Sequence, residues 1–525
     1  NNNFTGGFAL NAGQVTLGSD TGFGADQVNV AGGTNGIVFT GSRTVANNID
    51  LAGATTLTVG TGNTAQLDGV ITGAGSIVTG DVGRLLLTNN GSTFGGGVSL
   101  TQGTLALSAN AAAGTGAITA AGGTTLELIG GRTLANGIVL NGGLSVQTNN
   151  LANQFDGVVS GAGGLTVLTT AGAPFGQALT LANPGNTFAG GLTIGANANV
   201  RVSGDGALGD VAGGVTVNEG LLAVGGTFTS GRAVTLGADF GQFDVDGGQT
   251  LTLSGLISGG AGSDLRKGGD GLLIIGNGGN NFGDGARVFG GELRLSASNA
   301  LGNPGGQVQL FNAGVLGATG TVTIANAVEI VGGATGIDSG AGVFTISGVL
   351  SGNNNFTKTG AGILRLTGVN TYNGVIQLNA GEVDVDGSLA GGINAGAGTL
   401  VTGVGSVAGP ATITGGRLAP GNSPGTIAFG GNLTISGGTN LDFELAGLAG
   451  VPGVDADLIT VGGDLDINGA VLNITALPGF NVGVGNRTLI TYAGQLLNFS
   501  NVTISNPAPP EVTFSFLPVP GVGPF

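Results

Sequence analysis

Residues 348–374 read GVLSGNNNFTKTGAGILRLTGVNTYNG, and this stretch holds the pattern that decides the fold. Its apolar run, Ile363 to Leu366, lies between clusters of Gly, Asn and Thr. Apolar and β-branched residues bounded by turn-forming residues are typical of a short strand with a tight turn at each end. The stretch therefore predicts short β-strands in close succession and no helix.

The same pattern recurs along the chain with a period of roughly ninety residues. An aromatic residue marks each copy, and a Gly-[Val/Leu]-[Ile/Val/Leu]-[Ser/Thr]-Gly segment precedes four of the five. The marker aromatics are Phe4, Phe94, Phe188, Phe282 and Tyr372. Because repeats of fixed period stack on their neighbours, this spacing predicts coils that follow one axis. We expect the marker side chains to form an internal stack rather than an exposed ligand-binding row.

The composition agrees with an ordered all-β protein. Of the 525 residues 115 are Gly, yet 41% are hydrophobic and the mean hydropathy is +0.39, which disfavours disorder. Runs such as Leu165 to Leu168 place apolar residues at alternate positions, as in strands with one buried face. A sandwich or barrel would also use short strands, but the repeat favours a single elongated parallel β-helix, or β-solenoid. Coils of roughly 20 residues that rise ~4.8 Å each would span on the order of 120 Å.

Charge and missing residue types exclude several classes of function. The net charge is −16 with thirteen basic residues, so nucleic acid and anionic membrane surfaces are poor partners. Cys and His are absent, which excludes disulfides, Cys–His catalysis and the usual zinc sites. No uninterrupted apolar run is long enough for a transmembrane helix. The chain starts without Met and inside a repeat, so we expect a processed chain or a fragment.

Two landmarks carry a resemblance to a known family. Residues 348–374 follow the order G-V-[IL]-S-G, K-x-G-x-G-x-L-x-L-x-G and N-T-[FY]-x-G, and residues 255–283 keep this order with Lys267. Leu418 to Ile427 forms the second landmark. Both resemble the passenger-associated β-strand repeats of bacterial autotransporters (type V secretion). The resemblance implies a right-handed parallel β-helix that is exported to the outer cell surface.

The repeats and landmarks predict three regions. Residues 1–400 form a β-solenoid of repeats of roughly ninety residues. Residues 401–510 form C-terminal passenger-like coils, with strands around 441–445, 457–459 and 489–492. Residues 511–525 form a terminal strand followed by a linker rich in Pro and Gly.

The acidic residues are the only candidates for a chemical site. Glu382, Asp384 and Asp386 alternate with valines, which places three carboxylates on one face of a strand. Paired carboxylates serve glycoside hydrolysis, but a solvated outer face is the favoured interpretation, with weak cation binding second. Asp264 lies in a partial match to a calcium-binding nonapeptide at residues 259–267. We assign no catalytic, cofactor-binding or metal residue, and keep calcium at these four carboxylates as a weak hypothesis.

Residues Gly421 to Gly425 have the G-x-S-x-G spacing of a serine nucleophile elbow. Because the chain has no histidine to act as the base, we interpret this segment as a turn. The favoured function is that of an extracellular structural or adhesive surface protein, not an enzyme. Such a rigid rod could associate head to tail into fibres and contact glycans or neighbouring cells. The alternatives are a polysaccharide-active β-helix enzyme with surface carboxylates, and a ligand-binding adhesin with an insertion within residues 205–250.

Overall fold

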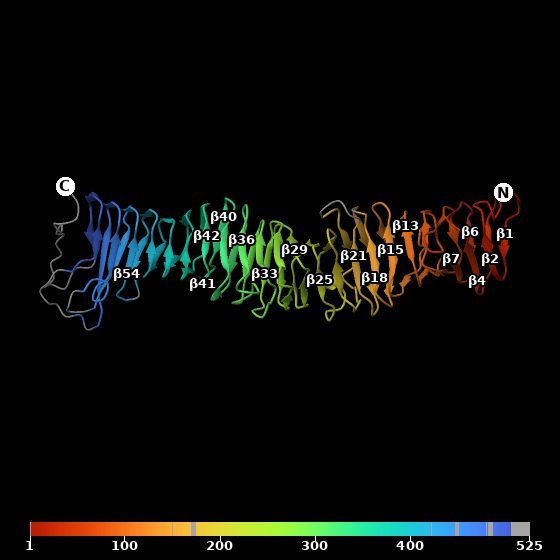
Figure 1. Ribbon diagram of the computed structural model, residues 1–525, viewed down its shortest axis with the longest axis horizontal. Coiled ribbons are helices and arrows are strands. Elements are labelled where there is room, and N and C mark those ends of the chain that lie inside the picture. Colours follow the sequence, from red (N-terminus) through yellow and green to blue (C-terminus); the bar gives the residue numbers. More distant parts are fainter. Residues whose placement is uncertain are drawn as a thin grey trace. The chain divides into compact units, whose positions relative to one another are not determined.

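The computed structural model describes residues 2–149, 151–169, 175–421, 423–446, 451–478, 480 and 487–505. The described residues form strands of two to six residues, which pair in parallel, and one short 3₁₀ helix, η1 (Asp205–Leu208). The chain divides into two compact units, residues 1–265 and 266–525. In each unit successive strands stack as the coils of a β-solenoid (Figure 1), so the all-β solenoid prediction is confirmed.

Each coil of the first unit contributes strands to ladders on up to three sides. We name each ladder by its first strand. The β1 ladder runs from β1 (Phe8–Leu10) to β9 (Ile71–Thr72), the β2 ladder from β2 (Gly13–Leu17) to β20 (Val159–Ser160), the β5 ladder from β5 (Arg43–Val45) to β31 (Ile257–Ser258), and the β16 ladder of this unit from β16 (Thr133–Leu134) to β29 (Phe240–Val245).

The second unit repeats this architecture, and its strands belong to four ladders. The β33 ladder runs from β33 (Leu272–Ile275) to β61 (Leu496–Ser500), the β34 ladder from β34 (Gly285–Val288) to β42 (Leu350–Gly352), the β38 ladder from β38 (Val322–Ile324) to β62 (Thr503–Ile504), and the β45 ladder from β45 (Val369–Asn370) to β60 (Ile490–Tyr492).

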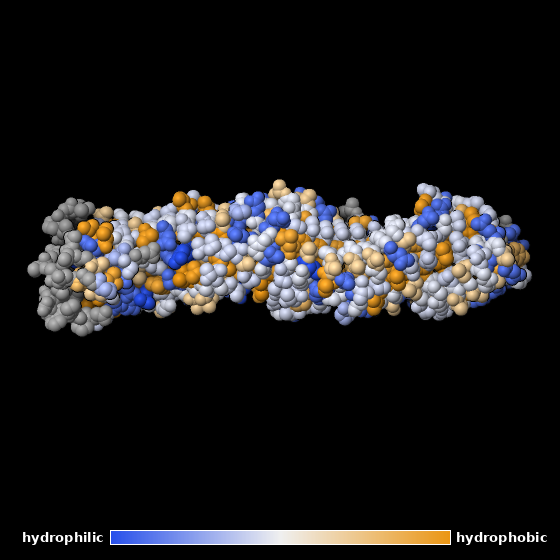
Figure 2. Space-filling view, turned by 90° about the horizontal axis from the view of Figure 1, so that it is seen from below, coloured by the Kyte–Doolittle hydropathy of each residue, from blue (hydrophilic) through white to orange (hydrophobic). Residues whose placement is uncertain are grey.

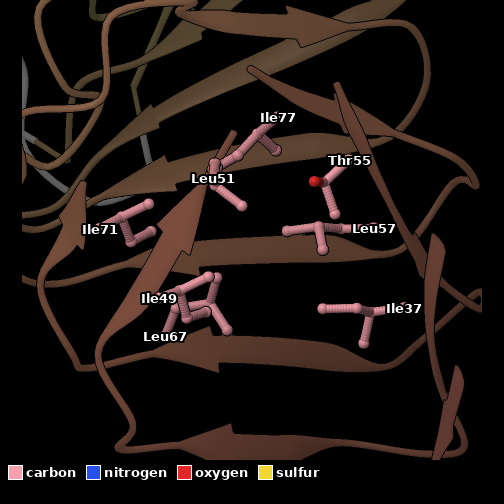
Figure 3. Close-up of a pocket in the computed structure, with 8 residues that line it drawn as sticks. All are labelled: Ile37, Ile49, Leu51, Thr55, Leu57, Leu67, Ile71 and Ile77. Atoms are coloured by element: carbon pink, nitrogen blue, oxygen red, sulfur yellow. The ribbon is translucent and has the colours of Figure 1, made fainter. Parts of the chain in front are cut away.

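The strand register gives the length of one coil. Ile118 pairs with Ile138, and Ile138 pairs with Val159, so a coil holds about 20 residues, as the sequence predicts. Alternate residues of each strand face inward, and in Figure 3 such side chains from the three sides of successive coils point into the interior. They come from four apolar or threonine positions on the β2 ladder, three on the β1 ladder and one on the β5 ladder: Ile37, Thr55, Leu57, Ile77, Ile49, Leu51, Ile71 and Leu67.

The period of roughly ninety residues corresponds to four coils plus one side. The β1 ladder ends at β9, and the next two coils carry no strand on that side, at residues 88–97 and 108–117, before β16 begins there. The β2 ladder then ends at β20, and residues 182–191 and 203–214 form the gap before β27 (Phe228–Ser230). In the second unit, residues 276–284 and 296–306 form the same two-coil gap before β38. We call each pair of strand-free segments an interruption.

The marker aromatics lie inside the interruptions. Phe94, Phe188 and Phe282 are each in the first of the two strand-free segments and are fully buried, and Tyr372 is buried beside β45. Phe4 is 39% exposed and departs from this rule. The predicted internal location is therefore confirmed for four markers. The predicted stack is wrong, because markers that recur only every fourth coil are too far apart for their rings to touch.

The two sequence markers meet at the ends of three ladders. The N–H of Val159, in the last strand of the β2 ladder, donates to Asn186 Oδ1 at 2.8 Å. The N–H of Leu350, in β42, donates to Asn370 Oδ1 at 2.8 Å, and the N–H of Ile71 in β9 donates to Ser92 Oγ at 3.2 Å. A polar side chain thus replaces the strand that would otherwise accept these hydrogen bonds.

Each buried Phe also receives a glycine from the next coil. Gly114 has a φ of +69°, and a Cβ at this position would lie 2.4 Å from the carbonyl oxygen of Phe94. Gly123 in the same unit has a similar φ of +78°, but a Cβ there would meet no atom within 4 Å. Alanine substitutions at these two positions therefore distinguish the cost of backbone strain, present at both, from the cost of a steric clash, present only at Gly114.

We expect Gly123→Ala to cost about 1–2 kcal/mol, from the left-handed backbone alone. Gly114→Ala should cost about 2 kcal/mol more, because the new methyl group displaces Phe94. Urea unfolding of both variants, followed by circular dichroism, measures the difference. Equal losses would show that the close approach to Phe94 contributes nothing.

The predicted C-terminal strands are confirmed where the structure describes them, as β56 (Asn440–Leu445), β57 (Leu458–Val461) and β60. The predicted strand and linker at residues 511–525 lie outside the described residues. Among the described residues, no helix is long and apolar enough to cross a membrane.

Candidate functional site

The three alternating carboxylates lie on and beside β47 (Glu382–Val385), where the intervening Val383 and Val385 are buried as predicted. Asp384 is not solvated, because only 6% of the residue is exposed. Its Oδ2 accepts a hydrogen bond from Arg365 Nε at 2.7 Å, and Asp386 Oδ2 lies 3.6 Å from the same nitrogen. Arg365 comes from β44 (Ile363–Leu366), one coil earlier, so the cluster joins two neighbouring strands.

Burial sets the protonation behaviour of this cluster. It raises the pKa of Asp384, which Arg365 lowers and the neighbouring Asp386 raises further. Burial and the charge of Asp384 also raise the pKa of Glu382. The guanidinium of Arg365 compensates two of the carboxylates, which is an arrangement that holds strands together.

Asp264 opens β32 (Asp264–Gly268) and is 1% exposed, with its own N–H donating to the carbonyl oxygen of Asp239 at 3.0 Å. Within the described part of the chain, no three acidic side chains gather in a way that could hold a metal ion. Calcium at Asp264, Glu382, Asp384 or Asp386 stays a hypothesis.

Gly421 to Gly425 connects β53 (Arg417–Pro420) to β54 (Thr426–Phe429), and its Asn422 lies outside the described residues. The N–H of Gly425 donates to Asp457 Oδ1 at 2.7 Å, and the N–H of Glu444 donates to Asp457 Oδ2 at 2.7 Å. Burial raises the pKa of Asp457 to about 6, although both N–H groups lower it. The segment forms a turn, and the buried carboxyl group of Asp457 links it by hydrogen bonds to Glu444.

Other ion pairs reach across two coils over a small residue. Arg294 Nη2 lies 2.7 Å from Asp338 Oδ2, and Gly317 pairs with both residues from the strand between them. Arg201 and Asp246 also form an ion pair in the first unit. Many of the scarce charges thus face one another on the outer faces of the sheets, where each pair stabilises the fold only modestly.

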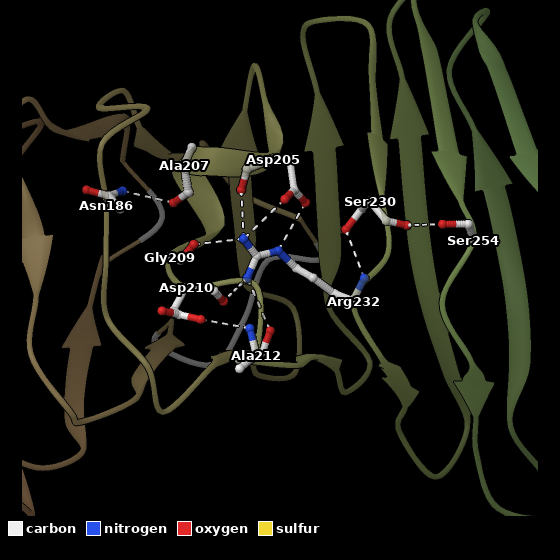
Figure 4. A network of polar contacts seen from close by, with 10 residues as sticks. Asn186, Asp205, Ala207, Gly209, Asp210, Ala212, Ser230, Arg232 and Ser254 are labelled. Atoms are coloured by element: carbon white, nitrogen blue, oxygen red, sulfur yellow. Dashed lines mark hydrogen bonds and ion pairs between the residues drawn. The ribbon is translucent and has the colours of Figure 1, made fainter.

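The interruption formed by residues 182–191 and 203–214 holds an extensive buried polar network (Figure 4). Arg232, which follows β27, is 2% exposed, and its Nε and Nη2 donate to the two carboxylate oxygens of Asp205 at 3.0 and 3.2 Å. The guanidinium also donates to the carbonyl oxygen of Gly209 at 2.7 Å and to that of Gly213 at 3.2 Å. One side chain therefore fastens η1 and the turn that follows it.

Asparagine occupies the equivalent position in the other interruptions. Asn136 Nδ2 donates to the carbonyl oxygens of Gly114 and Gly116 at 3.1 and 2.6 Å. Asn326 Nδ2 donates to those of Asn303 and Gly306, both at 2.9 Å. Arg232 is thus a longer version of a recurrent asparagine cap. A projecting insertion within residues 205–250 would have been evidence for the alternative of a ligand-binding adhesin. These residues instead continue the ladders with β25 (Val215–Val217) to β30 (Thr250–Leu253).

Both lysines of the chain are buried. The ammonium group of Lys358, with its three N–H donors, lies among four carbonyl oxygens. Nζ is 2.8, 2.8, 3.1 and 2.9 Å from those of Thr359, Gly360, Gly362 and Ala380. Lys267 Nζ donates to the carbonyl oxygens of Gly268, Gly269 and Gly290 at 2.6, 2.8 and 3.2 Å. The lysine of the repeat motif therefore stabilises a turn by binding its backbone carbonyl oxygens from the interior of the coil.

Sequence reasoning found the marker residues but missed these caps. The signal was present, because Asn136 and Asn326 each follow a glycine of their interruption, Gly114 and Gly306, by about one coil. On the face seen in Figure 2, weakly polar residues predominate, and strongly hydrophilic and apolar residues occur in small groups.

These features define a class: a parallel β-solenoid whose repeat is built around ladder interruptions. Residues 177–196 and 356–385 match the family model of the passenger-associated transport repeat. The chain therefore carries autotransporter passenger repeats, as the resemblance implies.

Two curated relatives are similar to parts of the chain. The adhesin BmaC autotransporter of Brucella suis is 31% identical over 285 residues, which is 49% of this chain and 8% of the relative. An extracellular serine protease of Serratia marcescens is 34% identical over 97 residues, which is 18% of this chain and 9% of the relative. The matched part thus spans less than a tenth of each relative. Together these likenesses indicate a secreted, extracellular protein of the cell surface.

Proposed function

We propose that the chain is an adhesive and structural segment of a surface protein, which acts by presenting the outer faces of a stiff solenoid. The observation that carries the proposal is the succession of stacked coils in each unit, whose interior holds buried apolar side chains and recurrent polar caps. Similarity to an adhesin over 285 residues supports the adhesive part. We propose no catalytic role for Glu382, Asp384 or Asp386, because the latter two share Arg365 as their counterion.

Display of the chain on a non-adherent bacterial cell tests the adhesive part. We expect cells that carry the chain to settle on abiotic or host-cell surfaces, or on one another, more than cells that carry an unrelated solenoid of similar length. No gain over that control would contradict the proposal.

The finer part of the proposal is head-to-tail association into fibres. Parallel ladders extend by the same backbone hydrogen bonds that join successive coils, so a strand of a second copy can continue them. In β61, Leu496 and Phe499 are 40% and 41% exposed, which offers apolar surface for such a contact. Electron microscopy of the purified chain over a range of concentrations tests this part. Filaments would support it, whereas isolated particles at every concentration would overturn it without affecting the adhesive part.

A further inference from the structure

A shallow groove runs over the outer face of the β33 ladder in the second unit. It crosses β46 (Val375–Leu378), β49 (Gly392–Ala395) and β52 (Ala411–Thr414), which are neighbours in the ladder. Its polar lining consists of two kinds of neutral group, the amides of Gln377, Asn379 and Asn394 and the hydroxyls of Thr412 and Thr414.

The strand register arranges these side chains as a column along the solenoid axis. Gln377 pairs with Asn394, Asn394 with Thr412, and Thr412 with Thr434. The rungs of such a column are ~4.8 Å apart. Asn394 Nδ2 lies 3.4 Å from Gln377 Oε1, so neighbouring amides are within contact of each other. The column thus offers donors and acceptors at a regular spacing.

A second column beside the first has a gap. Asn379 and Thr414 follow Gln377 and Thr412 by two residues, but Gly396 occupies the rung between them. A Cβ at Gly396 would meet no atom within 4 Å, and Gly396 does not have the left-handed φ that favours glycine. Ala395 and Ala397 add only methyl groups. The absence of a side chain at Gly396 therefore deepens the groove, although the backbone conformation there does not require glycine.

No charged side chain lines the groove, in a chain of net charge −16. The acidic neighbours in this ladder are engaged elsewhere, since Asp338 pairs with Arg294 at 2.7 Å and Asp466 accepts from Asn498 Nδ2 at 3.1 Å. Amides and hydroxyls both donate and accept hydrogen bonds, as sugar hydroxyl groups do. A neutral lining without a cation disfavours polyanions, which the acidic chain also repels at longer range.

We propose that this groove binds a neutral polysaccharide, with the sugar hydroxyls hydrogen-bonded to Gln377, Asn379, Asn394 and Thr412. This inference rests on the proposed adhesive function and names its ligand class. The polysaccharide lies along the columns, and the space above Gly396 receives one sugar ring.

Isothermal titration of the full chain with neutral hexasaccharides of glucose and of mannose, and with a heparin hexasaccharide, tests the proposal. We expect at least one neutral probe to bind and heparin to bind more weakly. The double variant N379A/N394A should lower affinity about tenfold or more, because it removes two of the side chains that hydrogen-bond to the sugar. Gly396→Gln, which fills the gap, should also lower it. Asn29→Ala, an exposed amide on β3 (Val28–Val30), is the matched control and should change nothing.

Each result decides the matter. Equal binding by N379A/N394A, Gly396→Gln and the parent chain would place the neutral glycan elsewhere and overturn the proposal. Preference for heparin, or no binding of any neutral probe, would also overturn it. If the displayed chain still makes cells adhere in that case, the adhesive function stands and only the glycan groove fails. If the cells do not adhere, the proposed function fails as well.

Discussion

Replacement of Arg232 by Ala is expected to lower the free energy of unfolding of the first unit by about 3–5 kcal/mol. The variant removes every hydrogen bond of the guanidinium and leaves the Asp205 carboxylate, with 25% of its side chain exposed, without its counterion. The carbonyl oxygens of Gly209 and Gly213 lose their buried donor at the same time. The loss should therefore exceed that of an ordinary surface ion pair, which is about 0–1 kcal/mol.

The repeats supply the control for this experiment. Arg232→Asn introduces the side chain that caps the equivalent turn at Asn136 and Asn326. Combined with Asp205→Asn, which removes the charge that Arg232 compensates, it should recover at least half of the stability that Arg232→Ala loses. Urea unfolding and amide hydrogen exchange across residues 204–213 measure both effects. Equal losses for Ala and for the Asn pair would refute the idea that Arg232 serves as an extended asparagine cap.

Local sequence patterns were sufficient to predict the strands, because alternation and turn residues act within a few positions. Val383 and Val385 point inward for this reason, and their acidic neighbours point outward. The coil length also followed, since short strands and short turns leave few ways to close a three-sided coil. These patterns could not show which residues of the neighbouring coils lie beside a given residue.

The function of the markers depends on that missing information. Phe94 looks like an element of an aromatic stack in the sequence, yet its neighbours are determined by residues one coil later, such as Gly114. Asn186 looks like a turn residue, yet its amide group ends a ladder whose last strand lies 27 residues earlier. Contacts of this kind arise from register, and register follows from the sum of all turn lengths.

The candidate site shows the same limit. Alternation placed Glu382, Asp384 and Asp386 on one face, but it did not bring Arg365 beside them, so Asp384 was expected to be solvated. The polar groove was also missed, because Gln377, Asn394 and Thr412 are unremarkable in sequence and gain meaning only as successive rungs.

Lys358 provides the second large expected effect, through pH. Burial lowers the pKa of its ammonium group from 10.5 to about 8, against the opposing charges of Asp338 and Glu382. Below pH 8 both the folded and the unfolded chain hold this proton, and the folded chain carries the cost of the buried charge. Between pH 8 and 10.5 the folded chain has released the proton while the unfolded chain retains it, so stability rises with pH.

We expect the free energy of unfolding of the second unit to increase by about 2–3 kcal/mol between pH 8 and pH 10, at 1.36 kcal/mol per pH unit. The window ends at pH 10 because burial raises the pKa of Tyr372 above its ordinary value of 10.0, which gives the opposite slope at higher pH. Urea unfolding at fixed pH values measures the increase. Lys358→Met, which keeps the length of the side chain but cannot titrate, should flatten the curve in this window.

The composition of the chain allows this titration to be observed directly. Lys267 and Lys358 are the only lysines, so Lys267→Met leaves a single lysine side chain for selective isotope labelling and magnetic resonance. Its signal should move with a midpoint near pH 8 in the folded chain and near pH 10.5 in urea. A folded midpoint near 10.5 would instead mean that the carbonyl oxygens of Thr359, Gly360, Gly362 and Ala380 compensate the whole cost of burial. In that case the unfolding curve of the parent chain should be as flat as that of Lys358→Met.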